Sequence, residues 1–497
     1  MSLLVALPFL IPMVAGSVSL LAWPSRRAQR AIAVVGTAGQ LIAAVVLLVV
    51  VWNDGIQVLA AGAWPAPYGI TLATDLLSAL MVLMTGITGF AAALYSLPTI
   101  SSRMERNGYY PLMHMLLAGV AGVFLTTDLF NLYVWFEILL LASFALLAMG
   151  QERAQMAGAL KYVVLNLFSS AMFLSALGLL YGLAGTLNMA DLAVKLPALD
   201  DGGRVTLVSM LFMVAFSIKA ASFPLFFWLP ASYHTAPVAV SALFAGLLTK
   251  VGVYSLYRTF TLVFTEDVPW THGWLQVSAG FTMVVGALGA LAQTDIRRTF
   301  AFLHVSQIGY MLMGLALFTP LALAAGVFYF AHHIIMKSNL FFLSGVIYRL
   351  GGSYRRDDLG GLWTARPWLS LVFLVPALSL CGIPPLSGFW GKLLIVRAGV
   401  DAGSGWLVAA VLVTSVLTLL AVMRIWADVF WKAAPQDRPV SRAPLPVMLW
   451  VVTVGLAAGT LWIGFTVEPL WALAERASAQ LLDPSAYIEA VLSPELP

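Results

Sequence analysis

The sequence predicts an all-α polytopic membrane protein with about 14 transmembrane helices. Of its 497 residues, 61% are hydrophobic and only 10% are charged, and its mean hydropathy is +0.93. A soluble domain carries roughly 25% charged residues, so this composition excludes the ordinary soluble classes. The chain also contains a series of apolar runs, each near the ~20 residues that a helix needs to cross a bilayer. A weak internal repeat, which holds five of these runs, is the third observation.

In chain order, the apolar runs begin near residues 3, 30, 71, 110, 129, 160, 205, 236, 272, 300, 320, 367, 405 and 445. The first run lacks the basic stretch and the cleavage site of a signal peptide, so we interpret it as a span. The seventh and twelfth helices are predicted to be broken, at Pro224 and at Pro384 and Pro385, because proline removes a backbone donor. At membrane depth, such breaks survive only inside protein or facing water.

The repeat pairs TDLFNLYVWFE, which begins at Thr127, with TDIRRTFAFLH, which begins at Thr294. The separation of these two threonines defines the repeat offset. The same offset pairs Tyr162 with Tyr329, and it places Glu137 opposite His304. Each copy holds five spans, and an odd number of spans inverts the second copy, as in many ion transporters. The predicted organisation is spans 1 to 3 in residues 1–100, a first repeat of spans 4 to 8 in 108–265, a second of spans 9 to 13 in 270–434, and span 14 with the tail in 443–497.

Basic residues gather in alternate loops, and the positive-inside rule places such loops in the cytoplasm. The odd-numbered loops are therefore expected in the cytoplasm and both termini outside. The residues behind this prediction are Arg26, Arg27, Arg30, Arg103, Arg106, Arg153, Lys161, Arg297, Arg298, Arg349, Arg355, Arg356, Arg366, Arg424, Lys432, Arg438 and Arg442.

Five charged side chains fall inside the apolar runs: Glu137, Lys219, Lys250, Lys337 and Lys392. A charge at mid-membrane costs at least ~3 kcal/mol, so each marks a functional-site hypothesis, and together they suggest a proton or ion path. Burial favours loss of a lysine proton, whereas a nearby carboxylate favours its retention. Glu137 and Lys219 could therefore act as an electrostatic switch, with the other lysines as further stations.

Histidines are the natural partners of such a path, because imidazole titrates near neutral pH. His332 and His333 precede Lys337 and are candidate relay residues. Adjacent residues on a helix point about 100° apart, so at most one of the two histidines is expected to face a given path. His304 is a further candidate relay, with a structural contact between helices as its alternative.

Each of these residues also has a simpler interpretation. Glu137 and Lys219 could form a structural ion pair, although desolvation makes such pairs poor stabilisers. Lys250 could extend its ammonium to an interface. For the remaining polar residues, His114 and His234 are interpreted as structural or as placed for proton uptake, His272 as a loop residue, and Asp128 and Asp295 as helix N-caps.

The sequence lacks the usual motifs of disulfide, cofactor, nucleotide and metal sites. Cys381 is the single cysteine, which excludes disulfides within the chain and disfavours an iron–sulfur cluster. Phosphate-binding loops, dinucleotide fingerprints and metal-spaced Cys/His sets are not found. We therefore expect no cofactor, no metal, no nucleic-acid partner and no enzymatic reaction, and transport that is driven by an ion gradient or by a partner.

The stretch FSIKAASFPLFFWLPASYHTAPVAVSALFAG, together with Glu137, Lys250 and Lys392, resembles the proton-translocating antiporter-like family. That family includes the membrane-arm subunits of respiratory complex I and the large subunits of Mrp-type multisubunit Na⁺/H⁺ antiporters. The resemblance implies that Glu137 and Lys219 are the switch pair, that Lys250 is the central connecting lysine, and that Lys392 is the last station of the second half-channel.

Within that family, LYGLAGTLNMADLAVKLPAL resembles the D-type members of the Mrp antiporters. The middle antiporter-like subunit of complex I usually has glutamate where this chain has Lys392. The implied partners are the A, B, C, E, F and G subunits of an Mrp complex in a bacterial plasma membrane, with H⁺ and Na⁺ as the transported ions. Two alternatives stay open: a subunit of a redox-driven proton pump, and a scaffold subunit with inactive channels.

Overall fold

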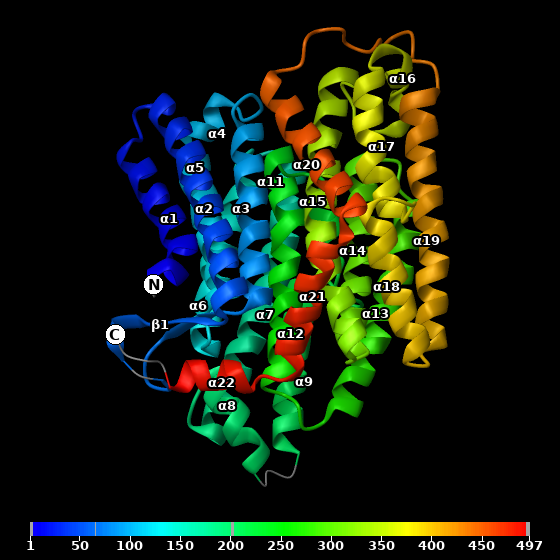
Figure 1. Cartoon of the computed structure of the whole chain (residues 1–497). Coiled ribbons are helices and arrows are strands. Elements are labelled where there is room, and N and C mark those ends of the chain that lie inside the picture. Colours follow the sequence, from blue (N-terminus) through cyan, green and yellow to red (C-terminus); the bar gives the residue numbers. More distant parts are fainter. Residues whose placement is uncertain (1–2, 65, 200–202, 494–497) are drawn as a thin grey trace.

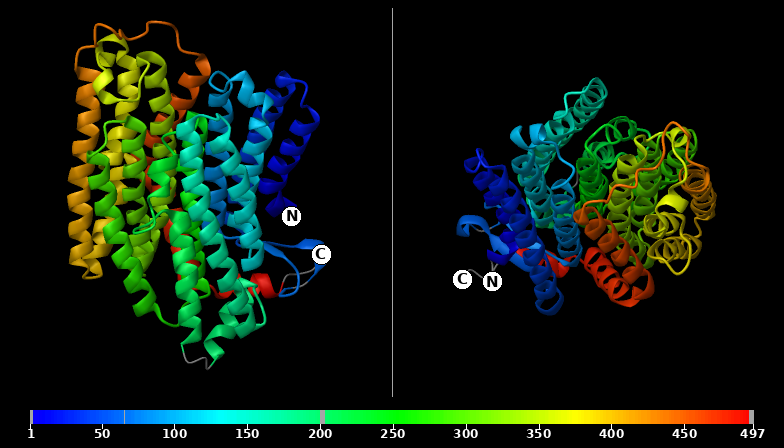
Figure 2. Two further views of the ribbon diagram at one scale, coloured as in Figure 1. Left: turned by 180° about the vertical axis from the view of Figure 1, so that it is seen from behind. Right: turned by 90° about the horizontal axis from the view of Figure 1, so that it is seen from above.

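A computed structural model describes residues 3–64, 66–199 and 203–493, and it is a bundle of roughly parallel and antiparallel helices (Figures 1 and 2). Among the described residues, eleven helices are long and apolar enough to cross a membrane. They are α1 (Leu3–Leu21), α2 (Arg26–Asp54), α3 (Leu76–Ser96), α6 (Leu129–Ala148), α7 (Arg153–Ala184), the run Val238–Leu262, α13 (Val268–Leu291), α14 (Ile296–Ala316), α15 (Pro320–Gly351), the run Gly405–Trp431 and α20 (Val447–Phe465).

Shorter helices occupy the places where the fourth, seventh and twelfth spans were expected. They are α5 (Tyr109–Leu125), α9 (Arg204–Ala220) and α17 (Pro367–Cys381). After α9 the chain leaves helical geometry and resumes in α10 (Trp228–Ser232), and after α17 it resumes in α18 (Ser387–Asp401). Both interruptions contain the predicted proline breaks. The run Val238–Leu262 is also irregular, because a π-helical turn, η3 (Phe244–Leu248), joins α11 (Val238–Leu243) to α12 (Thr249–Leu262).

The most buried helices form the centre of the bundle. In α14, α15 and the run Val238–Leu262, nearly every side chain of the apolar segment is buried inside the protein. Helix α15 packs on α3, α11, α14, α17, α18, α20 and α21 (Val467–Leu482), so it contacts helices from both the N-terminal and the C-terminal half of the chain. In contrast, α1, α2, α7 and α19 (Gly405–Ile425) expose many large apolar side chains, as expected of helices that face lipid.

Two backbone hydrogen bonds occur in both repeats, at positions that are separated by the repeat offset. Leu129 N donates to Leu187 O at 2.9 Å, and Ile296 N donates to Tyr354 O at 3.0 Å. Met189 N donates to Thr127 O at 2.8 Å, and Arg356 N donates to Thr294 O at 3.0 Å. Helices α7 and α15 have the same length, and their first residues are also separated by the repeat offset. The two copies of the sequence motif therefore build the same local structure.

Some expectations were wrong in detail. The run near residue 71 begins with a strand, β2 (Thr71–Thr74), which pairs antiparallel with β1 (Gln57–Ala60), and its helix starts only at Leu76. Asp75 accepts from Ser78 N at 2.8 Å and so caps that helix. His272 is not a loop residue: it is buried in α13, with its ring 4.6 Å from that of Phe318.

The tail forms two helices, α21 (Val467–Leu482) and α22 (Ser485–Leu492), which pack against the chain itself. Helix α21 lies along α15 and α3, and α22 runs across the lower part of the bundle in Figure 1, beside α8 (Met189–Lys195). The first turn of α1 and helix α22 lie toward one end of the bundle, whereas α4 (Ser102–Arg106) and α16 (Leu362–Ala365) lie at the other (Figure 1).

Candidate functional site: buried lysines and histidines

Lys219 occupies the last turn of α9, where the chain breaks. Its side chain is 5% exposed, and Nζ donates to Ser170 Oγ at 3.0 Å and to Asn166 O at 3.4 Å, both on α7. The negative end of the helix dipole favours a cation at this position. Trp228 Nε1 donates to Ile218 O at 2.9 Å, which provides a partner for a carbonyl at the end of the helix.

Helix α13 supplies the polar partners of the break itself. Phe223 N donates to Thr282 Oγ1 at 2.8 Å, and Ser278 Oγ donates to Phe223 O at 3.1 Å. Proline at position 224 removes one backbone donor, and these side chains satisfy the backbone around it. The break is therefore held by protein contacts at membrane depth, as an interior interruption requires.

Glu137 and Lys219 do not form an ion pair within 4 Å, and no ion pair of Glu137 occurs among the described residues. Glu137 is half-buried on α6, and its Oε1 has no hydrogen-bond partner in this described part of the chain. The lysine lies instead 5.3 Å from the ring centroid of Phe136. Glu137 and Lys219 thus do not form a direct ion pair in this structure, although their charges remain close enough to interact electrostatically.

Lys250 is fully buried on α12, so its ammonium does not extend to an interface. Its Nζ donates to Ala245 O, a carbonyl of the π-helical turn η3. A π turn shifts the normal hydrogen-bond ladder, and such turns are common at functional sites. Gly252, two residues on, approaches α9 so closely that a Cβ would lie 2.4 Å from Ala220 N. This contact packs α12 closely against the broken end of α9.

His304, His333 and Lys337 form a buried group between α14 and α15. The rings of His304 and His333 are 5.0 Å apart, and His304 Nε2 is 2.8 Å from Thr249 Oγ1 on α12. Lys337 Nζ has no hydrogen-bond partner among the described residues and lies 5.5 Å from the ring centroid of Phe300. The two histidines and Lys337 are within electrostatic range of one another and of Lys250.

The side chains of His332 and His333 point toward different neighbours, as expected of adjacent residues on a helix. Its Nδ1 is 2.8 Å from Ser387 Oγ, which in turn is 3.0 Å from Ser379 Oγ. These hydroxyls lie on the two sides of the second break, in α18 and α17. His332 and Lys392 are within electrostatic range of each other. His333 thus faces the buried group that it forms with His304 and Lys337, and His332 faces the second break.

Lys392 lies in the second turn of α18, yet it contacts the end of the preceding helix. Its Nζ donates to Cys381 O at 3.0 Å, and it lies 5.4 Å from the ring centroid of Tyr310. Cys381 is the last residue of α17, whose carbonyls form the negative end of the helix dipole. Lys219 and Lys392 therefore both lie beside a break, but the ammonium of Lys392 contacts the carbonyl end of α17, whereas that of Lys219 contacts α7.

Sequence reasoning missed the hydroxyl and carbonyl groups that hold the lysines and histidines. These partners are Ser170, Thr249, Ser379, Ser387 and the carbonyl oxygens of Ala245 and Cys381. The pairs Ser169–Ser170 and Ser387–Gly388 inside apolar segments were the available signal. Serine in a membrane helix often bonds its own backbone, so that signal alone carries little information.

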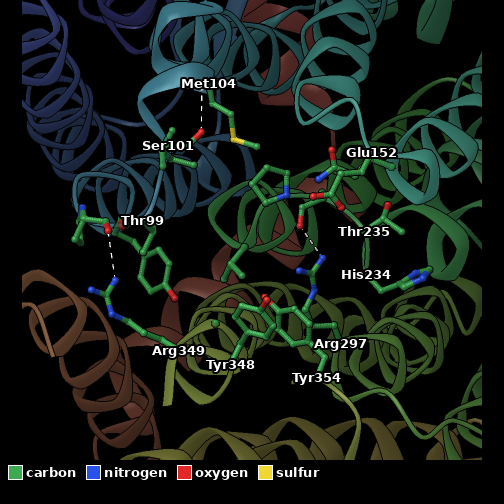
Figure 3. Close-up of a pocket in the computed structure, with 18 of the residues that line it drawn as sticks. Thr99, Ser101, Met104, Glu152, His234, Thr235, Arg297, Tyr348, Arg349 and Tyr354 are labelled. Carbon is green, nitrogen blue, oxygen red and sulfur yellow. Dashed lines mark hydrogen bonds between the residues drawn. The ribbon is translucent and has the colours of Figure 1, made fainter. Parts of the chain in front are cut away.

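A polar cavity of about 710 Å³ opens at the end of the bundle where α4 lies (Figure 3). Figure 3 shows Arg297, Arg349 and Tyr354 on one side of it, and Ser101 and Met104 on the other. Arg297 and Gln155 are among the residues that line it. Arg297 also donates to Tyr233 O at 3.1 Å, and the ring of Tyr233 is 6.1 Å from His304.

The remaining candidates have separate roles. Asp128 Oδ1 accepts from Asn131 N at 2.7 Å and Asp295 Oδ1 from Arg298 N at 2.8 Å, so both are N-caps, as predicted. His234 lines the cavity, and its Nδ1 is 2.7 Å from Pro230 O. His114 is buried against Gly16 and Gly36. In the part of the chain that the structure describes, His, Cys, Asp and Glu do not group in threes as a metal site would.

Known proteins share both this sequence and this fold. Residues 126–418 match the family described as the NADH:quinone oxidoreductase/Mrp antiporter transmembrane family. The D subunit of the Na⁺/H⁺ antiporter of Alkalihalophilus pseudofirmus is 43% identical over 99% of this chain and 100% of that protein.

Among solved structures, a chain of the Mrp complex from Dietzia sp. DQ12-45-1b matches with a TM-score of 0.93 and 31% identity, over 99% of this chain and 100% of that one. A chain of the membrane-bound sulfane sulfur reductase, an archaeal respiratory membrane complex, matches with a TM-score of 0.90 and 29% identity, over 99% of each chain. The protein therefore belongs to the NADH:quinone oxidoreductase/Mrp antiporter family of multi-pass membrane proteins.

Proposed function

We propose that this chain is the proton-translocating subunit of a multisubunit Na⁺/H⁺ antiporter. The observation that carries the proposal is the series of buried basic residues that runs from Lys219 through Lys250 and the His304–His333 pair to Lys392. Buried charges are costly in a membrane protein, and a scaffold with inactive channels has no need of them. The antiporter relative at 43% identity supports sodium/proton antiport as the reaction.

In this proposal Glu137 and Lys219 form the switch at one end of the path. Lys250 connects the first repeat to the second, and His304, His333 and Lys337 relay protons between them. His332 continues the relay toward the second break, and Lys392 is the last station. The break at Pro384 and Pro385 supplies the helix end on which Lys392 rests, whereas Lys219, beside the break at Pro224, rests on α7.

The proposed architecture has 14 spans, with broken seventh and twelfth helices and two inverted five-helix repeats in residues 108–265 and 270–434. Residues 1–100 add three spans, and 443–497 add the last span and the tail. The hydrogen bonds that recur at the repeat offset support the repeat. Its inversion is supported by α7 and α15, because α7 leads to α8 at one end of the bundle and α15 leads to α16 at the other (Figure 1).

The proposed location is a bacterial plasma membrane, with both termini outside. The basic α4 lies toward the opposite end of the bundle from the first turn of α1 and from α22, which agrees with a cytoplasmic α4 (Figure 1). The proposed partners are the A, B, C, E, F and G subunits of an Mrp complex. Because the described residues hold no carboxylate cluster suited to a cation, we assign protons to this chain and Na⁺ to another part of the complex.

A redox-driven proton pump is the second candidate. Its support is the match to the sulfane sulfur reductase, a respiratory complex, at a TM-score of 0.90. In both cases this chain moves protons and carries no catalytic reaction of its own. The two candidates differ in the partners that drive the movement.

The test begins with the intact complex purified through a tag on this chain, and with mass spectrometry of the proteins that co-purify. Small hydrophobic subunits with one very large antiporter-like chain, together with Na⁺-dependent proton efflux in reconstituted vesicles, are the expected result. Flavin and iron–sulfur proteins in the same particle would instead establish the redox pump. Intact Mrp particles without any Na⁺-dependent proton movement would refute the proposed function.

A further inference from the structure

The side chain on which Lys219 rests is a serine hydroxyl. Ser170 is buried on α7, and its hydroxyl accepts the hydrogen bond from Lys219 Nζ at 3.0 Å. Nothing in the apolar character of α7 requires a hydroxyl there. The neighbouring Ser169 already has a structural role, because its hydroxyl ties α7 to α9 through Ala215 O at 2.7 Å.

We propose that Ser170 is the second docking partner of Lys219, and that the lysine alternates between the Ser170 hydroxyl on α7 and the Glu137 carboxylate on α6. This inference rests on the proposed function. It names a positioning residue for the switch, since Ser170 acts through the lysine. The structure holds the lysine in the Ser170 position, with Glu137 Oε1 unpartnered among the described residues.

The chemistry of the two partners differs in a way that suits a switch. An ionised carboxylate carries a negative charge, so it favours a lysine that keeps its proton. A hydroxyl is neutral and both donates and accepts, so it can bond the charged ammonium and also the neutral amine. Lys219 can therefore pass its proton on toward Lys250 while it stays bonded to Ser170, whereas beside Glu137 the carboxylate charge opposes release of the proton. Asn166 O, 3.4 Å away, provides a further acceptor at the same position.

The repeat provides an independent argument. The repeat offset, which relates α7 to α15, places Ser170 opposite Lys337, Asn166 opposite His333, and Tyr162 opposite Tyr329. Residues four apart share one face of a helix. In α15 this face carries two of the proposed relay residues. Ser170 thus lies on the corresponding face of the first half, one helical turn from Asn166 and turned toward the lysine of α9.

The experiment compares Ser170→Thr with Ser170→Val in the intact complex. The two substitutions have nearly the same shape and differ in the hydroxyl. Ser170→Thr is expected to keep Na⁺-dependent proton flux within about twofold of the parent, and Ser170→Val to lower it about tenfold, the size expected for one charge-assisted hydrogen bond. Ser175→Val is the matched control, since Ser175 is exposed on the same helix and bonds only Ala171 O.

A structural measurement separates this mechanism from a packing effect. In a cryo-EM structure of the assembled Ser170→Val complex, Lys219 Nζ should move into direct contact with the Glu137 carboxylate. Equal flux in the Thr and Val variants, or a lysine that stays on α7 in the Val variant, would overturn the proposal while the antiport function stood. If the parent complex moved no protons, the proposed function would fail, and the position of Lys219 would still test the role of Ser170.

Discussion

Lys392 Nζ donates a 3.0 Å hydrogen bond to Cys381 O, across the interruption between α17 and α18. This bond brings a residue that follows the break in the sequence to the carbonyl end of the helix that precedes it. Lys219 also lies beside a break, but its Nζ donates to Ser170 Oγ and Asn166 O on α7 rather than to a helix end. The two halves thus hold their lysines beside a break through different partners, and several expected outcomes depend on these contacts.

The first prediction concerns the switch. Lys219→Ala and Glu137→Ala are each expected to reduce Na⁺-dependent proton flux to background, because either change removes one of the two charges on which the switch depends. Assembly of the complex should persist on a native gel. Lys161→Ala is the control, since Lys161 is exposed on α7 and should behave as the parent. Normal antiport in either switch variant would contradict the role.

A second prediction tests the contact made by Lys392. Lys392→Ala should stop proton flux through the second half. Gly382→Ala should weaken it as well, because Gly382 has φ of 85° and a Cβ there would lie 2.7 Å from Lys392 Cδ. Gly403→Ala separates contact from backbone strain: Gly403 also has a positive φ, but a Cβ there meets no described atom within 4 Å. Similar flux losses in both glycine variants would show that backbone strain alone is responsible.

Stability is the subject of the third prediction. Arg258 Nη2 and Asp75 Oδ2 are 2.7 Å apart, both nearly fully buried, and Tyr487 of α22 lies 4.9 Å from the guanidinium. Asp75→Asn leaves Arg258 buried without a counter-charge, which should cost about 3–5 kcal/mol. Asp357→Asn, in the exposed Arg355–Asp357 pair, should cost less than about 1 kcal/mol. Thermal unfolding of the detergent-purified protein measures the difference, and equal midpoints would count against a stabilising role for the buried pair.

The fourth prediction asks from which side the polar cavity is reached. Cys381→Ala removes the single cysteine and keeps the backbone carbonyl that Lys392 uses. In that background Thr235→Cys, in the cavity, and Arg27→Cys, exposed on α2, should both react with a membrane-impermeant thiol reagent from the cytoplasmic side. Only the cavity label should slow proton flux. Reaction of both cysteines from the outside would contradict the proposed orientation. Unchanged proton flux after the cavity is labelled would show that the cavity is not part of the proton path.

Five charges inside the apolar runs could be predicted from the sequence, because a charge in a long apolar run is conspicuous, whereas the buried Asp75–Arg258 pair was not foreseen. Glu137, Lys219, Lys250, Lys337 and Lys392 all stand out in this way. Proline at positions 224, 384 and 385 likewise marked where the helices are interrupted. The β-hairpin before α3 and the two tail helices were not foreseen, since short strands and surface helices leave little periodicity in an apolar chain.

By itself, the sequence determined that the chain is an all-helical membrane protein with ionisable groups in its interior. Hydrophobic length and charge cost are local properties, and each can be evaluated one segment at a time. Only the tertiary structure decided which partner each group has: Ser170 for Lys219, Ala245 O for Lys250, and Cys381 O for Lys392. Those partners come from helix ends, a π turn and a neighbouring helix, so they depend on how the helices pack against one another.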